Sequence, residues 1–260
     1  EEEAITALSR EASYLVELRH PSIVQSYGIT RIPEGKDVFG LVTKYMEHNL
    51  FGVIQEQVIS QATPISWSTR LKWVRDLAFG LRYLHSKGIN HGDIKSMNVL
   101  LSADLQSCQI CDFGSAGRAA TATLHTPQWS APEVLQGGIY TRKSDVYSFG
   151  VLVWEIVTFH HPYERKSLME AQRLIKAGQT PLVLWPELTP DDTPEVLSKI
   201  LDATLRKSAS RRPSMEAVCS TLSSQAPDEA WNILDSEDDG WVDPNAPMDE
   251  SFVKLDDSLP

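Results

Sequence analysis

The chain lacks a long hydrophobic run. No stretch approaches the roughly 18 to 20 apolar residues of a membrane-spanning helix, and the longest candidate, Phe149 to Phe159, contains Glu155. We therefore expect no transmembrane segment and predict that this run forms a buried helix in a globular domain. The sequence begins at Glu1 without a signal-peptide pattern, so we expect it to be part of a longer polypeptide.

Cysteine is scarce. The three cysteines, Cys108, Cys111 and Cys219, are an odd number and show neither a disulfide framework nor metal-ligand spacing. This usage predicts a reducing, intracellular location, most simply the cytoplasm. Cys111 leaves two interpretations open, a reactive thiol beside Asp112 or an inert packed side chain, and the second is favoured because free cysteines are usually buried.

The chain also lacks an excess of basic residues. Its formal net charge is −11, but residues 225–260 hold eleven acids against Lys254 alone, a net charge of −10. The other 224 residues, with 24 acids and 23 bases, are nearly neutral. Without a basic stripe that could replace the counterions of a phosphate backbone, a nucleic-acid partner is not expected.

Residues 225–260 are predicted to form a disordered acidic tail, because their few apolar groups cannot offset the entropy of ordering. Two segments in the tail, Trp231–Leu234 and Phe252–Leu255, have an aromatic-x-x-aliphatic pattern next to acidic residues. They resemble motifs that dock on ubiquitin-like autophagy modifiers by adding a strand. Such short patterns also arise by chance, so a tail that only improves solubility is the favoured alternative.

Hydrophobic spacing predicts an α+β fold. Residues 4–19 have helical periodicity, and the runs Ile23–Ile29 and Val38–Lys44, joined by a turn, indicate paired antiparallel strands. The later pattern is mainly helical, with short strand-like pieces at Asn98–Leu101 and Cys108–Cys111. Helices are predicted at Trp67–His85, Asp145–Thr158, Leu168–Ala177, Pro194–Ala203 and Ser214–Leu222.

The strongest chemical signal is the segment from His91 to Leu101, HGDIKSMNVLL, followed by Asp112-Phe113-Gly114. Asp93, Lys95 and Asn98 would place a proton acceptor, a cation and a metal ligand around one phosphoryl group. Asp112 could hold Mg²⁺ through its carboxylate oxygens. Because phosphoryl transfer depends on positioning and charge neutralisation, this set suits that reaction.

With these motifs, the chain from about Glu11 to Leu222 resembles the eukaryotic protein kinases, in particular the tyrosine-kinase-like serine/threonine group. Order and spacing also agree for the segments 126–133 (TPQWSAPE), 143–150 (KSDVYSFG) and 212–214 (RPS). The resemblance implies a kinase-like fold with a truncated N-lobe of one helix and two or three strands. The implied divisions are a partial N-lobe and hinge at 1–47, a mainly α-helical C-lobe at 48–224, and the tail at 225–260.

The resemblance also implies the chemistry of the site. Asp93 would accept or orient the substrate hydroxyl, Lys95 would stabilise the transferred phosphate, and Asn98 and Asp112 would hold Mg²⁺. Lys95 and Thr126 favour serine or threonine in a protein substrate as the phosphate acceptor.

ATP is the implied cosubstrate. The segment Leu41–Glu47 resembles the strand and hinge that border adenine. The nucleotide-binding residues implied by the resemblance are the back-pocket residue Thr43, the hinge residues Tyr45 and Met46, Leu100 beneath the adenine ring, and Glu11, which corresponds to the helix glutamate that pairs with a phosphate-binding lysine.

Two scaffold contacts are implied as well. Glu133 would pair with Arg212, and Asp145 would anchor the backbone of the catalytic loop. His91 is interpreted as a packed histidine that contacts Phe113 rather than as a catalyst.

The sequence departs from the kinase pattern at the phosphate-binding elements. No glycine precedes Glu11, and the first lysine is Lys36, beyond the predicted helix, so the glycine-rich loop and the strand lysine are missing from these 260 residues. We expect this polypeptide to bind ATP poorly and to turn over slowly. The alternative function is a catalytically weak or inactive pseudokinase that serves as a protein-interaction scaffold.

Overall fold

The computed structural model describes residues 18–31, 39–60, 64–113 and 126–224. Several predictions from the sequence lie outside these residues. They concern most of the helix at 4–19 with Glu11, the turn between the first two strands, and the tail with its segments Trp231–Leu234 and Phe252–Leu255.

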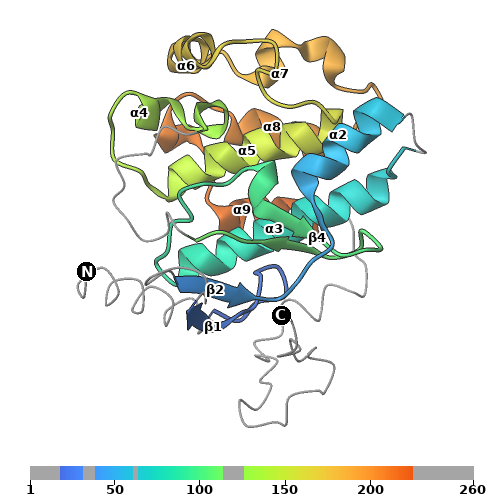
Figure 1. The fold of residues 1–260 in the computed structure, drawn as a ribbon. Coiled ribbons are helices and arrows are strands. Elements are labelled where there is room, and N and C mark those ends of the chain that lie inside the picture. The colour runs from blue at the N-terminus through green and yellow to red at the C-terminus, as the bar shows by residue number, and fades with distance from the viewer. Residues whose placement is uncertain (1–17, 32–38, 61–63, 114–125, 225–260) are drawn as a thin grey trace.

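The described elements form two small sheets and a larger helical body (Figure 1). The strands are β1 (Ser26–Arg31), β2 (Phe39–Thr43), β3 (His48–Asn49), β4 (Val99–Leu101) and β5 (Cys108–Ile110). The helices are α2 (Leu50–Ser60), α3 (Trp67–Ser86), α4 (Pro132–Leu135), α5 (Arg142–Thr158), α6 (Leu168–Ala177), α7 (Pro181–Leu184), α8 (Glu195–Thr204) and α9 (Met215–Ser223). Short 3-10 helices are η1 (Ser96–Asn98), η2 (Pro127–Trp129), η3 (Pro186–Leu188) and η4 (Ala209–Arg211).

The predicted strand pair is confirmed. Strands β1 and β2 are antiparallel, with a register irregularity between Ser26 and Gly28. The first strand begins at Ser26 rather than at Ile23, because the preceding residues pair with β5 instead. Val24 N donates to Ile110 O at 2.9 Å, and Ile110 N donates to Ser22 O at 2.9 Å. The start of β1 is thereby tied to β5.

The second sheet lies on the helical body and has the order β3-β4-β5, all antiparallel. The predicted strand pieces at 98–101 and 108–111 correspond to β4 and β5. Every residue of β5 is buried, and α3 contacts this strand. The sheet therefore supports the two chain segments that lead into and out of the His91–Asp112 region.

Helix α5 forms the centre of the core. It crosses the middle of the helical body (Figure 1) and contacts both α3 and α8. All residues from Ser144 to Val157 are buried, as the apolar run in the sequence predicts. Trp73, Trp129 and Trp154 lie in the same core cluster.

Capping residues set the start of α5. Thr141 is the N-cap; its hydroxyl accepts a hydrogen bond from Lys143 N, and the Ser144 hydroxyl accepts one from Thr141 N at 3.1 Å. This capping box satisfies backbone donors of the first turn. The helix therefore begins at Arg142, three residues before the predicted start, because its polar first turn has no apolar periodicity.

Helix α2 was not predicted from the sequence. Gly52 and four β-branched residues weaken its helical signal. The structure stabilises its first turn through Asn49, whose Oδ1 accepts a hydrogen bond from Gly52 N at 2.8 Å. The buried residues Leu50 and Ile54 join the core, so tertiary packing outweighs the weak local preference.

No helix in the described part of the chain combines the length and apolar character needed to cross a membrane.

Helices α5 and α8 pack closely against each other at Gly150. A Cβ atom at this position would overlap Thr204 Oγ1 and would lie 3.1 Å from Leu205 Cδ2. We predict that Gly150→Ala lowers the free energy of unfolding by about 1–3 kcal/mol, because the core cannot accept the added methyl group without moving a helix. Urea unfolding followed by circular dichroism measures this change.

Gly52→Ala is the matched control for that substitution. The nearest heavy atom to its added Cβ is Asn49 Oδ1 at 3.4 Å, so the higher helix propensity of alanine should leave stability unchanged or raise it. Equal destabilisation by both substitutions would contradict the packing argument.

Candidate active site

The segment that begins at His91 is held in place by Asp145, in the first turn of α5. The Asp145 carboxylate accepts hydrogen bonds from His91 N at 2.9 Å, from Gly92 N at 3.1 Å and from His85 Nε2 at 2.8 Å. Gly92 has φ = 86°, a left-handed conformation that favours glycine. The predicted anchoring contact is thus present, and His85 adds a partner that the sequence did not reveal.

Asp145 is a fully buried carboxylate. Burial alone would raise its pKa, but the hydrogen bond and electrostatic interaction with His85, together with the hydrogen bond from Tyr140, lower it more. The net pKa lies below the ordinary value, so this group is ionised at neutral pH. A buried anion with several donors is costly to disturb, because removing its charge leaves those donors poorly satisfied.

Asp93 is the centre of the candidate site. Its Oδ2 accepts from Lys95 Nζ at 2.6 Å and from Asn98 Nδ2 at 3.1 Å, and its Oδ1 accepts from Thr126 Oγ1 at 3.2 Å. The Asp93 side chain is 27% exposed, so a substrate group has access to the carboxylate. Three residues that were predicted from the sequence, Lys95, Asn98 and Thr126, are therefore gathered around the Asp93 carboxylate.

The orientation of Asn98 suits a metal ligand. Its Nδ2 also donates to the backbone oxygen of Asp93 at 2.8 Å, which leaves the amide oxygen Oδ1 as the group for an ion. Asp112 could supply a second oxygen ligand; it is exposed and has φ = 61°. Oxygen donors of this kind suit Mg²⁺, which usually completes its octahedron with water and phosphate oxygens.

No cluster of three His, Cys, Asp or Glu side chains in the described ranges could hold a metal by itself. A Mg²⁺ ion shared with phosphate groups needs only one or two protein ligands, so the pair of Asn98 and Asp112 fits that kind of site.

His91 connects the loop of Asp93 to the segment of Asp112. His91 Nδ1 accepts from Asp93 N at 3.3 Å, so Nε2 carries the proton and donates to Cys111 O at 3.0 Å. Burial lowers the pKa of His91, with partial opposition from nearby carboxylates, so the ring is neutral at physiological pH. Its ring lies 5.2 Å from that of Phe113, and the prediction of a packed histidine is confirmed.

Cys111 is half-buried in this segment. Burial, followed by the charge of Asp112, raises the pKa of its thiol to about 12. The thiol is therefore protonated at neutral pH, and the interpretation as a reactive thiolate finds no support.

A second buried carboxylate, Glu155, joins the site to the far end of α5. It accepts from Ser96 Oγ at 2.8 Å and from Trp129 Nε1 at 2.6 Å, and it contacts His161 Nδ1 at 3.1 Å. Burial raises the pKa of Glu155, and these hydrogen bonds offset only part of that effect. The partners of Glu155 are not evident from the sequence, although a charged residue in the middle of an apolar run indicates a buried polar contact.

The described residues implied for nucleotide binding lie at the end of β2, in the segment between β2 and β3, and in β4. Met46 is buried, Thr43 is exposed at the end of β2, and Leu100 in β4 pairs with Asn49 in β3. Tyr45 is 79% exposed, so its side chain points into solvent. Glu11 lies outside the described residues.

The predicted ion pair of Glu133 and Arg212 is confirmed. Arg212 donates from Nη1 to Glu133 Oε1 at 2.7 Å and from Nη2 to Oε2 at 2.8 Å. Burial would raise the pKa of Glu133, but the hydrogen bond and charge of Arg212 outweigh burial and hold the pKa below its usual value. This bidentate pair connects α4 to the turn before α9, so it belongs to the scaffold.

Comparison with known proteins agrees with this geometry. The sequence profile of the family described as protein tyrosine and serine/threonine kinase matches residues 1–222. A probable LIM domain-containing serine/threonine-protein kinase of Dictyostelium discoideum is 29% identical over 80% of the chain and 31% of its own length.

Two further relatives extend the comparison. The probable serine/threonine-protein kinase drkA of Dictyostelium discoideum is 32% identical over 86% of the chain and 34% of its own length. The human dual specificity testis-specific protein kinase 1 is 36% identical over 57% of the chain and 24% of its own length. The chain thus spans about a third or less of these three relatives.

The Glu133–Arg212 pair gives a prediction with a defined pH dependence. Glu133→Gln should lower the free energy of unfolding by about 3 kcal/mol at neutral pH, because it leaves a buried guanidinium without its anion. Since the folded-state pKa of Glu133 is lowered, the contribution of the carboxylate is present above its unfolded-state pKa and is lost as pH falls through the folded-state value.

Urea unfolding of both proteins at neutral pH and below about pH 4 tests this statement. The difference in free energy of unfolding between wild type and Glu133→Gln should be smaller at the lower pH. Glu187→Gln, at an exposed position, is the control and should change stability little at either pH. If the difference in free energy of unfolding between wild type and Glu133→Gln stays constant or grows as the pH falls, the stabilising role of the Glu133–Arg212 ion pair is wrong.

Proposed function

The chain belongs to the family of protein tyrosine and serine/threonine kinases, and on this premise we propose that it transfers the γ-phosphate of ATP to serine and threonine hydroxyls of proteins. Kinases of this family use ATP and Mg²⁺. The observation that carries the proposal is the Asp93 carboxylate, held by Lys95 and Thr126 and open to solvent. This carboxylate has the surroundings that a phosphoryl-transfer site requires.

In the proposed reaction, Asp93 accepts a hydrogen bond from the substrate hydroxyl and orients it for attack. Lys95, 2.6 Å from this carboxylate, places its positive charge where the transferred group gains negative charge. Thr126 bonds to the other oxygen of Asp93 and so fixes the direction in which the carboxylate faces. The three side chains position the acceptor, which is the main task in a loose phosphoryl-transfer transition state.

Asn98 and Asp112 are the proposed Mg²⁺ ligands. When bound, Mg²⁺ neutralises negative charge on phosphate oxygens. The hydrogen bonds from Asn98 Nδ2 to Asp93 would fix the direction of Oδ1. His91 would keep Asp112 near Asp93, because it bonds to the backbone on both sides.

The proposed adenine site is formed by Thr43, Met46 and Leu100, together with the backbone of Tyr45. The pairing of β3 with β4 supports this proposal, since it brings Leu100 opposite Asn49, three residues after Met46. Glu11 keeps its proposed role as the partner of a phosphate-binding lysine.

The proposed domain division is a partial N-lobe and hinge at 1–47, a C-lobe at 48–224 and a tail at 225–260. The free cysteines of the described residues support an intracellular, reducing location. The residue types at Lys95 and Thr126 support serine and threonine as acceptors.

A second function, that of a pseudokinase scaffold, rests on a different observation. The 260 residues contain no glycine-rich loop and no lysine before Lys36. A chain that cannot position the phosphates of ATP would keep the fold and lose most of the rate. A kinase should lose phosphate transfer when Asp93 is substituted and Mg²⁺-dependent ATP binding when Asp112 is substituted. A pseudokinase scaffold should show neither loss.

The test measures transfer of labelled γ-phosphate from Mg²⁺-ATP to a protein acceptor by the natural polypeptide that contains these residues. We predict that Asp93→Asn lowers the transfer rate by about two to four orders of magnitude while the melting temperature changes little. Asp112→Asn should abolish Mg²⁺-dependent ATP binding at an equally small cost in stability, because this side chain is exposed. Phosphoamino-acid analysis identifies the acceptor residue.

Asp202→Asn, at an exposed position on α8, is the matched control and should keep full activity. If neither the wild type nor Asp93→Asn transfers phosphate, and ATP binding does not depend on Mg²⁺, the kinase proposal fails and the scaffold function stands. If phosphotyrosine is the main product, the kinase proposal stands and only the assignment of serine and threonine as acceptors is wrong.

A further inference from the structure

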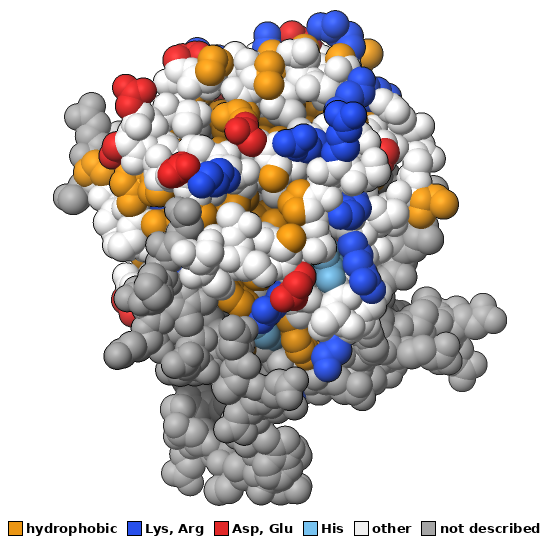
Figure 2. Space-filling view, turned by 180° about the vertical axis from the view of Figure 1, so that it is seen from behind, with side chains coloured by type: hydrophobic (Ala, Val, Ile, Leu, Met, Phe, Trp, Pro, Cys, Tyr) orange, Lys and Arg blue, Asp and Glu red, His pale blue; other side chains and the backbone are white. Residues whose placement is uncertain are grey.

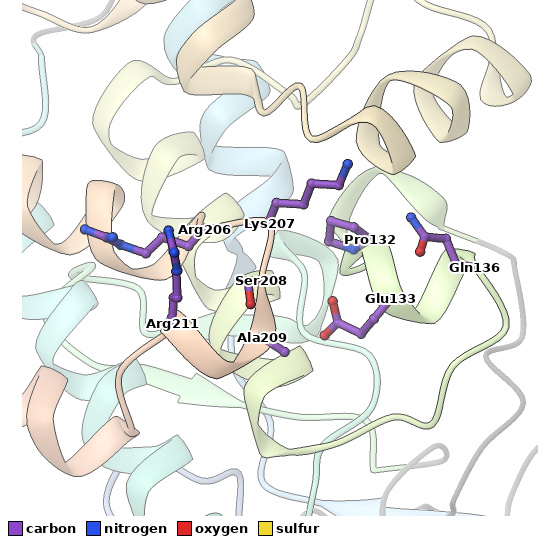
Figure 3. A pocket seen from close by; sticks show the side chains of 8 residues that line it. All are labelled: Pro132, Glu133, Gln136, Arg206, Lys207, Ser208, Ala209 and Arg211. Carbon is purple, nitrogen blue, oxygen red and sulfur yellow. The ribbon is translucent and has the colours of Figure 1, made fainter.

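A pocket unrelated to the Asp93 site opens between α4 and η4 (Figure 3). It has a volume of about 590 Å³, and Pro132, Glu133 and Gln136 form one side. The opposite side is formed by the turn after α8 and by η4, with Arg206, Lys207, Ser208, Ala209 and Arg211. Three basic residues and one acid thus line a space large enough for several side chains.

The positive charge of this pocket is not neutralised within the described part of the chain. Arg206, Lys207 and Arg211 are exposed, and none of the three forms an ion pair with another described residue. Lys207 Nζ contacts only the neutral backbone oxygen of Ala177, at 3.4 Å. The acid of the pocket, Glu133, is already paired with Arg212, so the lining presents a net positive surface.

The basic side of the pocket is rigidly placed. Arg212, which is fully buried, donates from Nε to Arg206 O at 2.8 Å and from Nη2 to Lys207 O at 2.9 Å. The guanidinium that binds Glu133 therefore also fixes the backbone that carries two of the basic residues. Such preorganisation reduces the entropy lost when an anionic ligand binds.

Lys and Arg side chains also form a band down the right half of the face seen from behind (Figure 2). Opposite charge is concentrated elsewhere in the chain. Residues 225–260 carry a net charge of −10, and five successive residues, 235–239, include four acids: Asp235, Glu237, Asp238 and Asp239. This is the densest acidic run in a tail that otherwise has one lysine.

The acidic run can reach the pocket. Helix α9 starts four residues after Arg211 and has nine residues, so it carries the chain only about 14 Å. The eleven residues from Gln225 to Asp235 can span up to about 36 Å when extended. A tethered segment acts at a high effective concentration, so even weak individual ion pairs can hold it.

We propose that the acidic run 235–239 of the tail docks in cis on the basic pocket formed by Arg206, Lys207 and Arg211. The segment fits this pocket by charge and by length. Docking would place the tail against the turn between α8 and α9, on a surface separate from the Asp93 site. It does not depend on whether the chain transfers phosphate.

The experiment is an NMR comparison of the ¹⁵N-labelled full chain with a free synthetic peptide of residues 225–260, at low ionic strength. In the wild type, the amide signals of 235–239 should be displaced from their positions in the peptide. The triple substitution Arg206→Gln, Lys207→Gln and Arg211→Gln should lower the ratio of docked to free tail about tenfold, because three ion pairs are lost. Added salt should have the same effect.

A matched control removes the same amount of charge elsewhere. Lys44→Gln, Lys87→Gln and Arg165→Gln are at exposed positions outside the pocket, and this variant should keep the displaced tail signals. If the pocket variant disturbs the fold, a second variant tests the same contact through the tail. It replaces the four acids of the run 235–239 with their amides. The side-chain signals of Arg206 and Arg211 then report release of the tail.

Two results would overturn the proposal. Tail signals identical to those of the free peptide in the wild type would mean that the tail does not dock. If the amide signals of 235–239 stay displaced in the pocket variant, the tail binds at a site other than this pocket. If the tail is free while an added acidic peptide binds the wild type and not the pocket variant, the pocket serves a separate partner and docking in cis is wrong.

Discussion

The structure depends on one buried anion, Asp145. Its carboxylate lies in the first turn of the central helix α5 and binds two successive backbone amides, His91 N and Gly92 N. Those amides begin the segment that carries Asp93. Because a buried carboxylate must be fully satisfied by donors, this contact fixes the direction in which the segment leaves α3. The positions of Lys95 and Asn98 follow from that direction.

Helix α5 organises the site from both of its ends. Asp145 holds the start of the Asp93 segment, and Glu155, ten residues later, binds Ser96 and Trp129. Ser148, between them, donates to Trp129 O at 2.8 Å. These polar contacts join the segment of Asp93 to that of Thr126, so the two meet at the Asp93 carboxylate. The helix that forms the apolar core thus also sets the geometry of the candidate active site.

Much of this arrangement was predictable because it is local in sequence. Asp93, Lys95 and Asn98 are close neighbours, and α3 and α6 have clear apolar periodicity. The kinase resemblance supplied the long-range pairs Glu133–Arg212 and Asp145 with the loop. The partners of Glu155 were not predictable, since they join residues 26 and 59 positions apart through a buried network. Helix α2 was missed because packing outweighs its weak helical propensity.

The most direct test of the central role of Asp145 is hydrogen exchange of the His91 and Gly92 amides in wild type and in Asp145→Asn, with α8 amides as internal reference. We predict that the substitution accelerates exchange at His91 and Gly92 about tenfold to a hundredfold more than in α8, because hydrogen bonds to a charged acceptor are lost. Equal acceleration at all these sites, or none at His91 and Gly92, would contradict it.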